Sequence, residues 1–164
     1  MPYIGAGFQR FNTANGLTVN GNTDIDGGSI KLDGDFPVGT RNVALGDTAL
    51  DDGSLSGSDN TAIGHNALSA NTSAFGNTTL GSNAGALITT GSKNVAIGNF
   101  TLDANTTGAE NTGVGTYCLG ANTTAGNNTA IGYISLTSNT TGAQNTALGG
   151  GSLGNNTTAS YNTG

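Results

Sequence analysis

Few side chains in this 164-residue chain could carry out catalysis. His65 and Cys118 are its single histidine and single cysteine, and neither has partners spaced as in a Ser-His-Asp triad or a Cys-His pair. His65 follows Gly64 at a variable position, and Cys118 reads as a small residue that fills a repeat position. We therefore expect His65 to be an exposed loop residue. We expect neither an enzyme nor a cofactor.

Clustered aspartates could bind calcium, because hard cations take several oxygen ligands. Their spacing matches neither the EF-hand loop nor the Gly-Gly-x-Gly-x-Asp nonapeptide. Solvated strand faces are therefore the preferred interpretation, and no metal site is expected. The aspartates concerned are Asp24, Asp26, Asp33, Asp35, Asp47, Asp51 and Asp52.

Asn-x-Ser/Thr sequences recur along the chain, and four of them are spaced by 17 residues and continue with a pair of threonines. Asparagine ladders at turns are the preferred interpretation. N-glycosylation remains an alternative, and a flat threonine array that matches an ice lattice is another. The asparagines that begin such sequences include Asn71, Asn77, Asn105, Asn122, Asn139 and Asn156.

The composition excludes several partners. The chain has 29 Gly, 9% charged residues, a net charge of −6 and only four cations, so it offers no basic patch for nucleic acid. No apolar run approaches the ~20 residues that span a bilayer. Residues 1–15 lack the pattern of a secretion signal, so we expect neither membrane insertion nor Sec export.

A phrase related to Ala-Ile-Gly occurs seven times. In each copy a large residue precedes glycine, and a leucine follows the large residue five positions later. We predict that both sets stack as the core. The large residues are Leu45, Ile63, Phe75, Ile97, Val114, Ile131 and Leu148, and the leucines are Leu50, Leu68, Leu80, Leu102, Leu119, Leu136 and Leu153.

Two further columns accompany the large residue. Asparagine stands three positions before it, with Thr72 as the exception, and predicts an Asn ladder of Asn42, Asn60, Asn94, Asn111, Asn128 and Asn145. The residue directly before it is never larger than alanine, which predicts close approach of another chain. This predicted chain-chain contact comprises Ala44, Ala62, Ala74, Ala96, Ala130 and Ala147.

The intervals between the glycines of the phrase are 18, 12, 22, 17, 17 and 17 residues. Because 12 and 22 sum to twice 17, we predict a loop shortened on one turn and lengthened on the next. Asn128–Gly132 alternates as a strand, and Ile134–Leu136 predicts a second short strand. The prediction is an all-β fold: a parallel β-roll or β-solenoid of about seven 17-residue rungs.

One class of enzyme uses a related pattern. Left-handed β-helix acyltransferases also place an aliphatic residue before glycine, but their turns need multiples of six residues. The interval of 18 fits that rule and the three successive intervals of 17 do not, which disfavours this class.

Residues 1–40 carry a different β pattern, in short alternating segments such as Gly16–Gly21 and Ser29–Gly34. Asp35–Thr40 reads as a junction. We predict two parts, an N-terminal attachment segment at residues 1–40 and a β-roll repeat domain at residues 41–164.

Asn94-Val95-Ala96-Ile97-Gly98 and its copies resemble the head repeat of YadA-like trimeric autotransporter adhesins. Similar repeats occur in bacteriophage tail fibres, and Gly16–Gly34 resembles strand phrases of phage fibre stalks. The resemblance covers residues 42–164 and implies a trimeric, rod-like β-roll. Adhesin heads usually use a repeat shorter than 17 residues.

The expected function is a structural and adhesive fibre subunit of a virion. It would act as a homotrimer, attach to the virion tail or a neighbouring filament through residues 1–40, and reach a cell-surface glycan receptor. The alternatives are a bacterial cell-surface adhesin or extracellular filament subunit, and an ice-binding β-solenoid.

Overall fold

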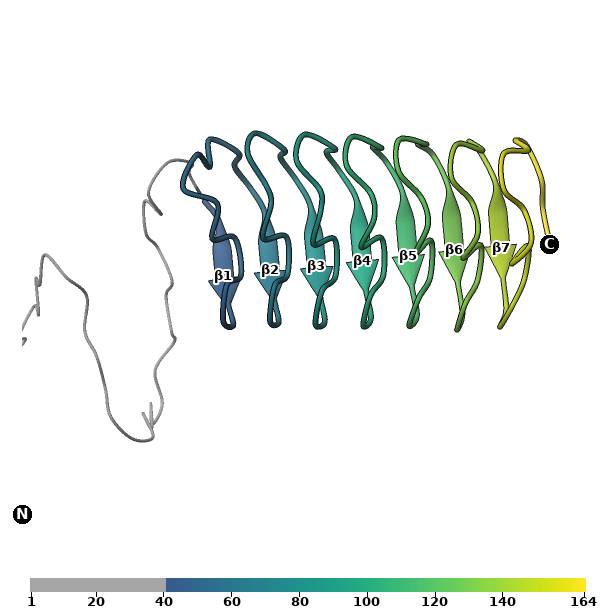
Figure 1. Ribbon diagram of the computed structural model, residues 1–164, viewed down its shortest axis with the longest axis horizontal. Helices are drawn as coiled ribbons and strands as arrows, with labels where there is room; N and C mark the ends of the chain where they lie inside the picture. Colours follow the sequence, from purple (N-terminus) through teal and green to yellow (C-terminus); the bar gives the residue numbers. More distant parts are fainter. Residues whose placement is uncertain (1–40) are drawn as a thin grey trace, which may run out of the picture. The chain divides into compact units, whose positions relative to one another are not determined.

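The computed structural model describes residues 41–164, which form a parallel β-solenoid (Figure 1). Seven three-residue strands lie side by side in chain order in one parallel sheet, which confirms the predicted all-β fold. The described residues contain no helix. The strands are β1 (Val43–Leu45), β2 (Thr61–Ile63), β3 (Thr78–Leu80), β4 (Val95–Ile97), β5 (Thr112–Val114), β6 (Thr129–Ile131) and β7 (Thr146–Leu148).

The register corrects the alignment of the third copy. Ile63 pairs with Leu80 and Leu80 with Ile97, so Leu80 is the large strand residue of its rung. Phe75 lies outside the strands, in the turn before β3. The phrase Ala74-Phe75-Gly76 resembles the repeat but precedes the strand of its rung, so the compensating short and long loops do not exist. After one rung of 18 residues, the pairing keeps a spacing of 17 residues along the stack.

A rung is defined here as one repeat that begins at its ladder asparagine. Backbone amides of each rung bond to carbonyls of both neighbouring rungs; for example, Gly98 N–H donates to Leu80 O and Val95 N–H to Asn111 O, both at 2.8 Å. The glycine after each strand has a steric cause. Gly98 has φ +133°, and a Cβ there would lie 2.6 Å from Gly115 O in the next rung.

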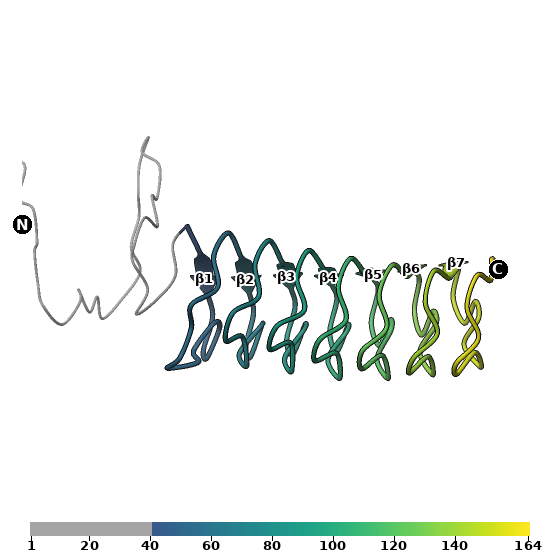
Figure 2. The same ribbon diagram turned by 90° about the horizontal axis from the view of Figure 1, so that it is seen from above.

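The interior is a thin layer between the strands and the returning chain. Figure 2 shows the strands on one side of the stack and the return segments on the other. The strands contribute their central residue, which is Ala62, Ala96 or Ala130 in three of the rungs, all fully buried. The return segments contribute six of the seven predicted leucines, of which Leu50, Leu68, Leu102, Leu119 and Leu136 are buried and Leu153 is partly buried against the cluster. The seventh, Leu80, lies in β3 and is exposed, so its predicted place in the core is wrong.

The predicted large-residue half of the core is wrong. Strand side chains alternate between two faces, and the first and third residues of each strand point away from the interior. Leu45, Phe75, Ile131 and Leu148 are exposed, and Ile63, Ile97 and Val114 are only half-buried. The layer between strand and return segment admits alanine from the strand because leucine already fills it from the other side.

The predicted chain-chain contact is wrong for the same reason. Ala62, Ala74, Ala96, Ala130 and Ala147 are buried within their own chain, so they cannot contact another copy. Ala44 is half-buried and packs against the same core. Small residues occupy this column because it faces the interior.

The return segment does not form the predicted second strand. Ile134 and Leu136 both have positive φ, of 50° and 51°, and the leucines of the same column repeat this value in neighbouring rungs. Left-handed backbone is unfavourable for such residues. It turns the leucines inward, and their burial offsets the cost.

Volume is conserved where the repeat changes. In the rung of β3, Gly85 replaces the core leucine, and Thr79 replaces the strand alanine. A Cβ on Gly85 would lie 2.8 Å from Ile88 Cδ1 and 3.1 Å from Thr79 Cγ2. The buried side chain of Ile88 therefore fills the space that a leucine fills elsewhere.

Candidate functional site

The asparagine ladder runs through the solenoid beside the strands and is confirmed. Asn111 Nδ2 donates to Asn94 Oδ1 in the preceding rung at 3.2 Å. It also donates to Ala125 O at 2.8 Å, a bond that links the start of the rung to its last turn. Its backbone N–H also donates to Asn94 Oδ1, at 2.9 Å. Asn77, and not Thr72, continues the ladder between Asn60 and Asn94.

A second ladder is formed by asparagines of the Asn-x-Ser/Thr sequences. Asn122 Nδ2 donates to Asn105 Oδ1 at 3.1 Å and to Ala125 O at 3.0 Å. Asn139 and Asn156 repeat this arrangement. Because the amide nitrogen is buried and bonded at Asn105, Asn122 and Asn139, a glycan on it would require these rungs to open. Both ladders therefore stabilise the fold, in agreement with the prediction of asparagine ladders at turns.

The threonine pairs are divided between structure and surface. Thr106 Oγ1 donates to Thr123 O at 3.1 Å, and Thr123 Oγ1 donates to Thr140 O at 3.2 Å. The second member of each pair, such as Thr107 or Thr124, is exposed. One exposed row of hydroxyls therefore follows this turn.

The outer apolar column is a surface feature that recurs in every rung of residues 41–164. It lies on the sheet face away from the interior, and four members are strongly exposed: Leu148 by 68%, Leu45 by 58%, Leu80 by 45% and Ile131 by 39%. Valine or threonine stands two residues before each member, and neither position carries a charge. The column comprises Leu45, Ile63, Leu80, Ile97, Val114, Ile131 and Leu148.

Comparison with protein-family models, curated proteins and solved structures finds no match to this chain. The candidate sites are therefore described from their own geometry.

One turn edge gathers aromatic side chains. Phe100 and Tyr117 stack with ring centroids 5.3 Å apart and planes 3° apart. Tyr133 follows in the next rung, one position earlier in the repeat, and is 61% exposed. We name Phe100, Tyr117 and Tyr133 the aromatic edge. Sequence reasoning missed it, although the 17-residue spacing of Phe100 and Tyr117 is a signal that could have found it.

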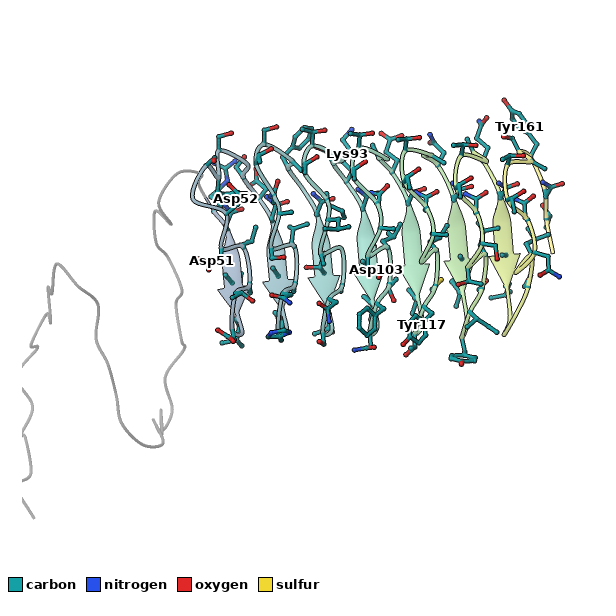
Figure 3. All side chains as sticks on the ribbon, in the orientation of Figure 1. Asp51, Asp52, Lys93, Asp103, Tyr117 and Tyr161 are labelled. Atoms are coloured by element: carbon teal, nitrogen blue, oxygen red, sulfur yellow. The ribbon has the colours of Figure 1, made fainter. Side chains whose placement is uncertain are left out.

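The opposite turn edge carries the ion pairs. Arg41 Nε lies 2.5 Å from an Asp59 oxygen, and Lys93 Nζ lies 3.4 Å from Glu110 Oε1, with all four side chains substantially exposed. Figure 3 shows Lys93 and Tyr161 on this edge and Tyr117 on the other. The hydrogen bond from Arg41 holds the pKa of the Asp59 carboxyl below its usual value. Stacked positions with opposite charges favour the observed register.

The remaining titratable groups have local explanations. His65 is exposed, as expected. Cys118 is fully buried, its Sγ lies 3.0 Å from Ala130 O, and burial raises the pKa of its thiol to about 11. Burial also raises the pKa of the Asp103 carboxyl, on the return segment.

Within residues 41–164, no three side chains of His, Cys, Asp or Glu lie close enough together to hold a metal ion. Asp47, Asp51 and Asp52 therefore do not form such a site. Asp24, Asp26, Asp33 and Asp35 lie outside the described residues, as does the predicted attachment segment at residues 1–40. No helix in the described part of the chain is long and apolar enough to cross a membrane.

Proposed function

We infer that this chain is a structural and adhesive fibre subunit of a virion, of the kind that forms phage tail fibres. Residues 41–164 would supply a rigid rod, and residues 1–40 would attach it to the virion tail or to a neighbouring filament. Three copies would assemble side by side along the rod. The repeat resemblance favours this role over the other functions that a β-solenoid can serve.

The outer apolar column is the observation that carries this proposal. It runs along every rung, it carries no charge, and its residues leave substantial apolar surface in water. Contiguous apolar surface of this kind on a soluble chain indicates an interaction site. Because the column repeats with the period of the rungs, a second copy in register meets the same chemistry at every rung.

A narrow column suits three copies around a common axis. Each rung presents one large apolar side chain, flanked by valine or threonine, and three such side chains can meet in one layer. This interface replaces the alanine contact expected from the sequence. The sheet faces would then be covered without joining sheet edges, which limits uncontrolled strand pairing.

A bacterial cell-surface adhesin or extracellular filament subunit is the second candidate. It uses the same rod and the same interface, and it differs in the structure to which the rod is attached. Immunogold electron microscopy with antibodies against residues 41–164 separates the two. Gold on particle appendages is the expected result. Gold on the cell envelope alone would favour the adhesin.

An ice-binding solenoid is a third candidate because of the exposed threonine row. Its partner threonines donate their hydroxyls to the next rung, as in the bond from Thr106 Oγ1 to Thr123 O, which leaves a single exposed row on that turn. Thermal hysteresis of the purified chain tests this function. A freezing-point depression that disappears in Thr107→Val/Thr124→Val would favour it over the fibre.

A further inference from the structure

The aromatic edge combines two properties that framework packing does not require. The two framework columns that bond or pack most directly, the asparagine ladder and the core leucines, keep one residue type along the stack apart from Gly85. The two turn positions at this edge instead change at every rung, from Asp47-Thr48 and His65-Asn66 to Asn99-Phe100 and Thr116-Tyr117. Variable positions on a repetitive framework are where binding specificity can be placed without loss of the fold.

The aromatic residues occupy backbone that does not favour them. Phe100 and Tyr117 have φ of 52° and 56°, whereas Asn66 and Asn83 occupy the same column two rungs and one rung before Phe100. Asparagine tolerates this left-handed region better than most residues. The core leucines with similar φ are compensated by burial, but Tyr117 is 44% exposed. The positive φ itself belongs to the turn, since Thr48 and Ile134 share it at 56° and 50°. What distinguishes this edge is that large aromatic side chains occupy the position, with Tyr117 left exposed.

The chemistry of the edge selects a ligand class. Asn99 and Thr116 directly precede Phe100 and Tyr117 in the sequence, and neither their side chains nor the hydroxyl of Tyr133 make a hydrogen bond within residues 41–164. From β3 to β7, the four residues after each strand include no charged side chain. Because Phe100 and Tyr117 stack on each other, a ligand can reach only the outer faces and edges of that pair and the exposed ring of Tyr133. These apolar surfaces, next to hydroxyl and amide groups, match the alternating apolar and polar faces of a sugar.

We propose that the aromatic edge, formed by Phe100, Tyr117 and Tyr133, binds a neutral polysaccharide. This proposal rests on the adhesive function proposed above and specifies its receptor. Neutral sugar chains fit because an acidic polysaccharide would find no cation on this edge. Consecutive rungs lie about 4.8 Å apart, so the edge offers a sugar chain several contacts in a row.

The test is affinity electrophoresis of the full chain in native gels that contain hydroxyethyl cellulose, dextran or galactomannan, with alginate as the acidic comparison. The test variant is Phe100→Asn/Tyr117→Asn/Tyr133→Ser, which copies residues from other rungs at the same columns and relieves backbone strain. The control is Tyr161→Asn, since Tyr161 is 78% exposed on the opposite edge and has a similar φ of 62°.

We expect at least one neutral polymer to retard the wild-type chain and the control equally, and the triple variant to bind at least ~10-fold more weakly. Light scattering should give the same mass for all three proteins. Three results would overturn the proposal: no retardation by any neutral polymer, equal retardation of the triple variant, or retardation by alginate as strong as by the neutral polymers.

A fourth result would also overturn it. If the triple variant lost both binding and oligomer mass, the aromatic edge would be a contact between copies. Retardation by a neutral polymer of a chain that proved monomeric would support the sugar site while removing the trimer, so the two proposals fail separately.

Discussion

Asn111 donates both its backbone amide and its side-chain amide to Oδ1 of Asn94, at 2.9 and 3.2 Å. Asn128 repeats both bonds onto Oδ1 of Asn111. Each ladder asparagine thus satisfies a buried backbone amide of the next rung as well as a side chain. The ladder therefore couples neighbouring rungs directly. Removal of one ladder side chain breaks hydrogen bonds to the rung before it and to the rung after it.

Replacing Asn111 with alanine should lower the free energy of unfolding by roughly 3 kcal/mol, because the buried backbone amide of Asn128 loses its acceptor. The matched control is Asn99→Ala, at a turn position whose side chain makes no bond to the next rung. Urea unfolding followed by circular dichroism measures both. Equal midpoints for the two variants would show that the ladder does not stabilise the stack.

Leu119→Ala should destabilise the chain by about 2–5 kcal/mol, because it opens a cavity in the thin interior. Leu87 also lies on a return segment but is 53% exposed, so Leu87→Ala should change stability by less than ~0.5 kcal/mol. Thermal unfolding of both variants provides the comparison. A larger loss for Leu87→Ala would mean that the inward face of the return segment is wrongly assigned.

The solenoid, its period and the Asn ladder could be predicted from the sequence, but the direction of the faces could not. Alternation along a strand separates two faces and does not say which is inside. Here the return leucines fill the interior only because their backbone is left-handed. Leucine does not favour this conformation, so the φ of 53° at Leu119 could not be predicted from its residue type. Residue size alone therefore predicts the large residues inside and the alanines outside, the reverse of the observed arrangement.

The third rung shows a second limit. Ala74-Phe75-Gly76 matches the local phrase, while the true strand Thr78–Leu80 departs from it at Thr79. Only the pairing of Leu80 with Ile63 and Ile97 decides between them. The aromatic edge is not evident from the sequence because the column of Phe100 and Tyr117 changes residue type from rung to rung, and Tyr133 lies one position earlier in the repeat.

Cys118 should resist modification in the folded chain. Its thiol is fully buried and its pKa is raised to about 11, so almost no reactive thiolate is present at pH 8. An aromatic disulfide reagent should react at the rate at which the rung opens, and at full speed in urea. Fast labelling of the native chain would contradict the buried position. Cys118→Ser should fold, because Ser135 occupies the same column in the next rung.

Asp103→Asn should stabilise the folded chain at neutral pH. Burial raises the folded pKa of Asp103 above its unfolded value, so the folded state holds the proton more tightly. The charged form therefore penalises folding fully above the folded pKa, and the penalty disappears below the unfolded pKa. Melting temperatures should differ between the variant and the wild type at pH 7 and converge at pH 2. A difference that grows towards acid pH would reverse the assigned sign.

The central claim is that the outer apolar column joins three copies of the rod. The most direct measurement is light scattering, combined with circular dichroism, on the full chain and on Ile97→Asp/Ile131→Asp. We expect three times the chain mass for the wild type. The variant should give a single chain mass with its β content intact, because both side chains point away from the core. A wild-type chain that remains monomeric at micromolar concentration, or a variant that keeps the trimer, would contradict the account.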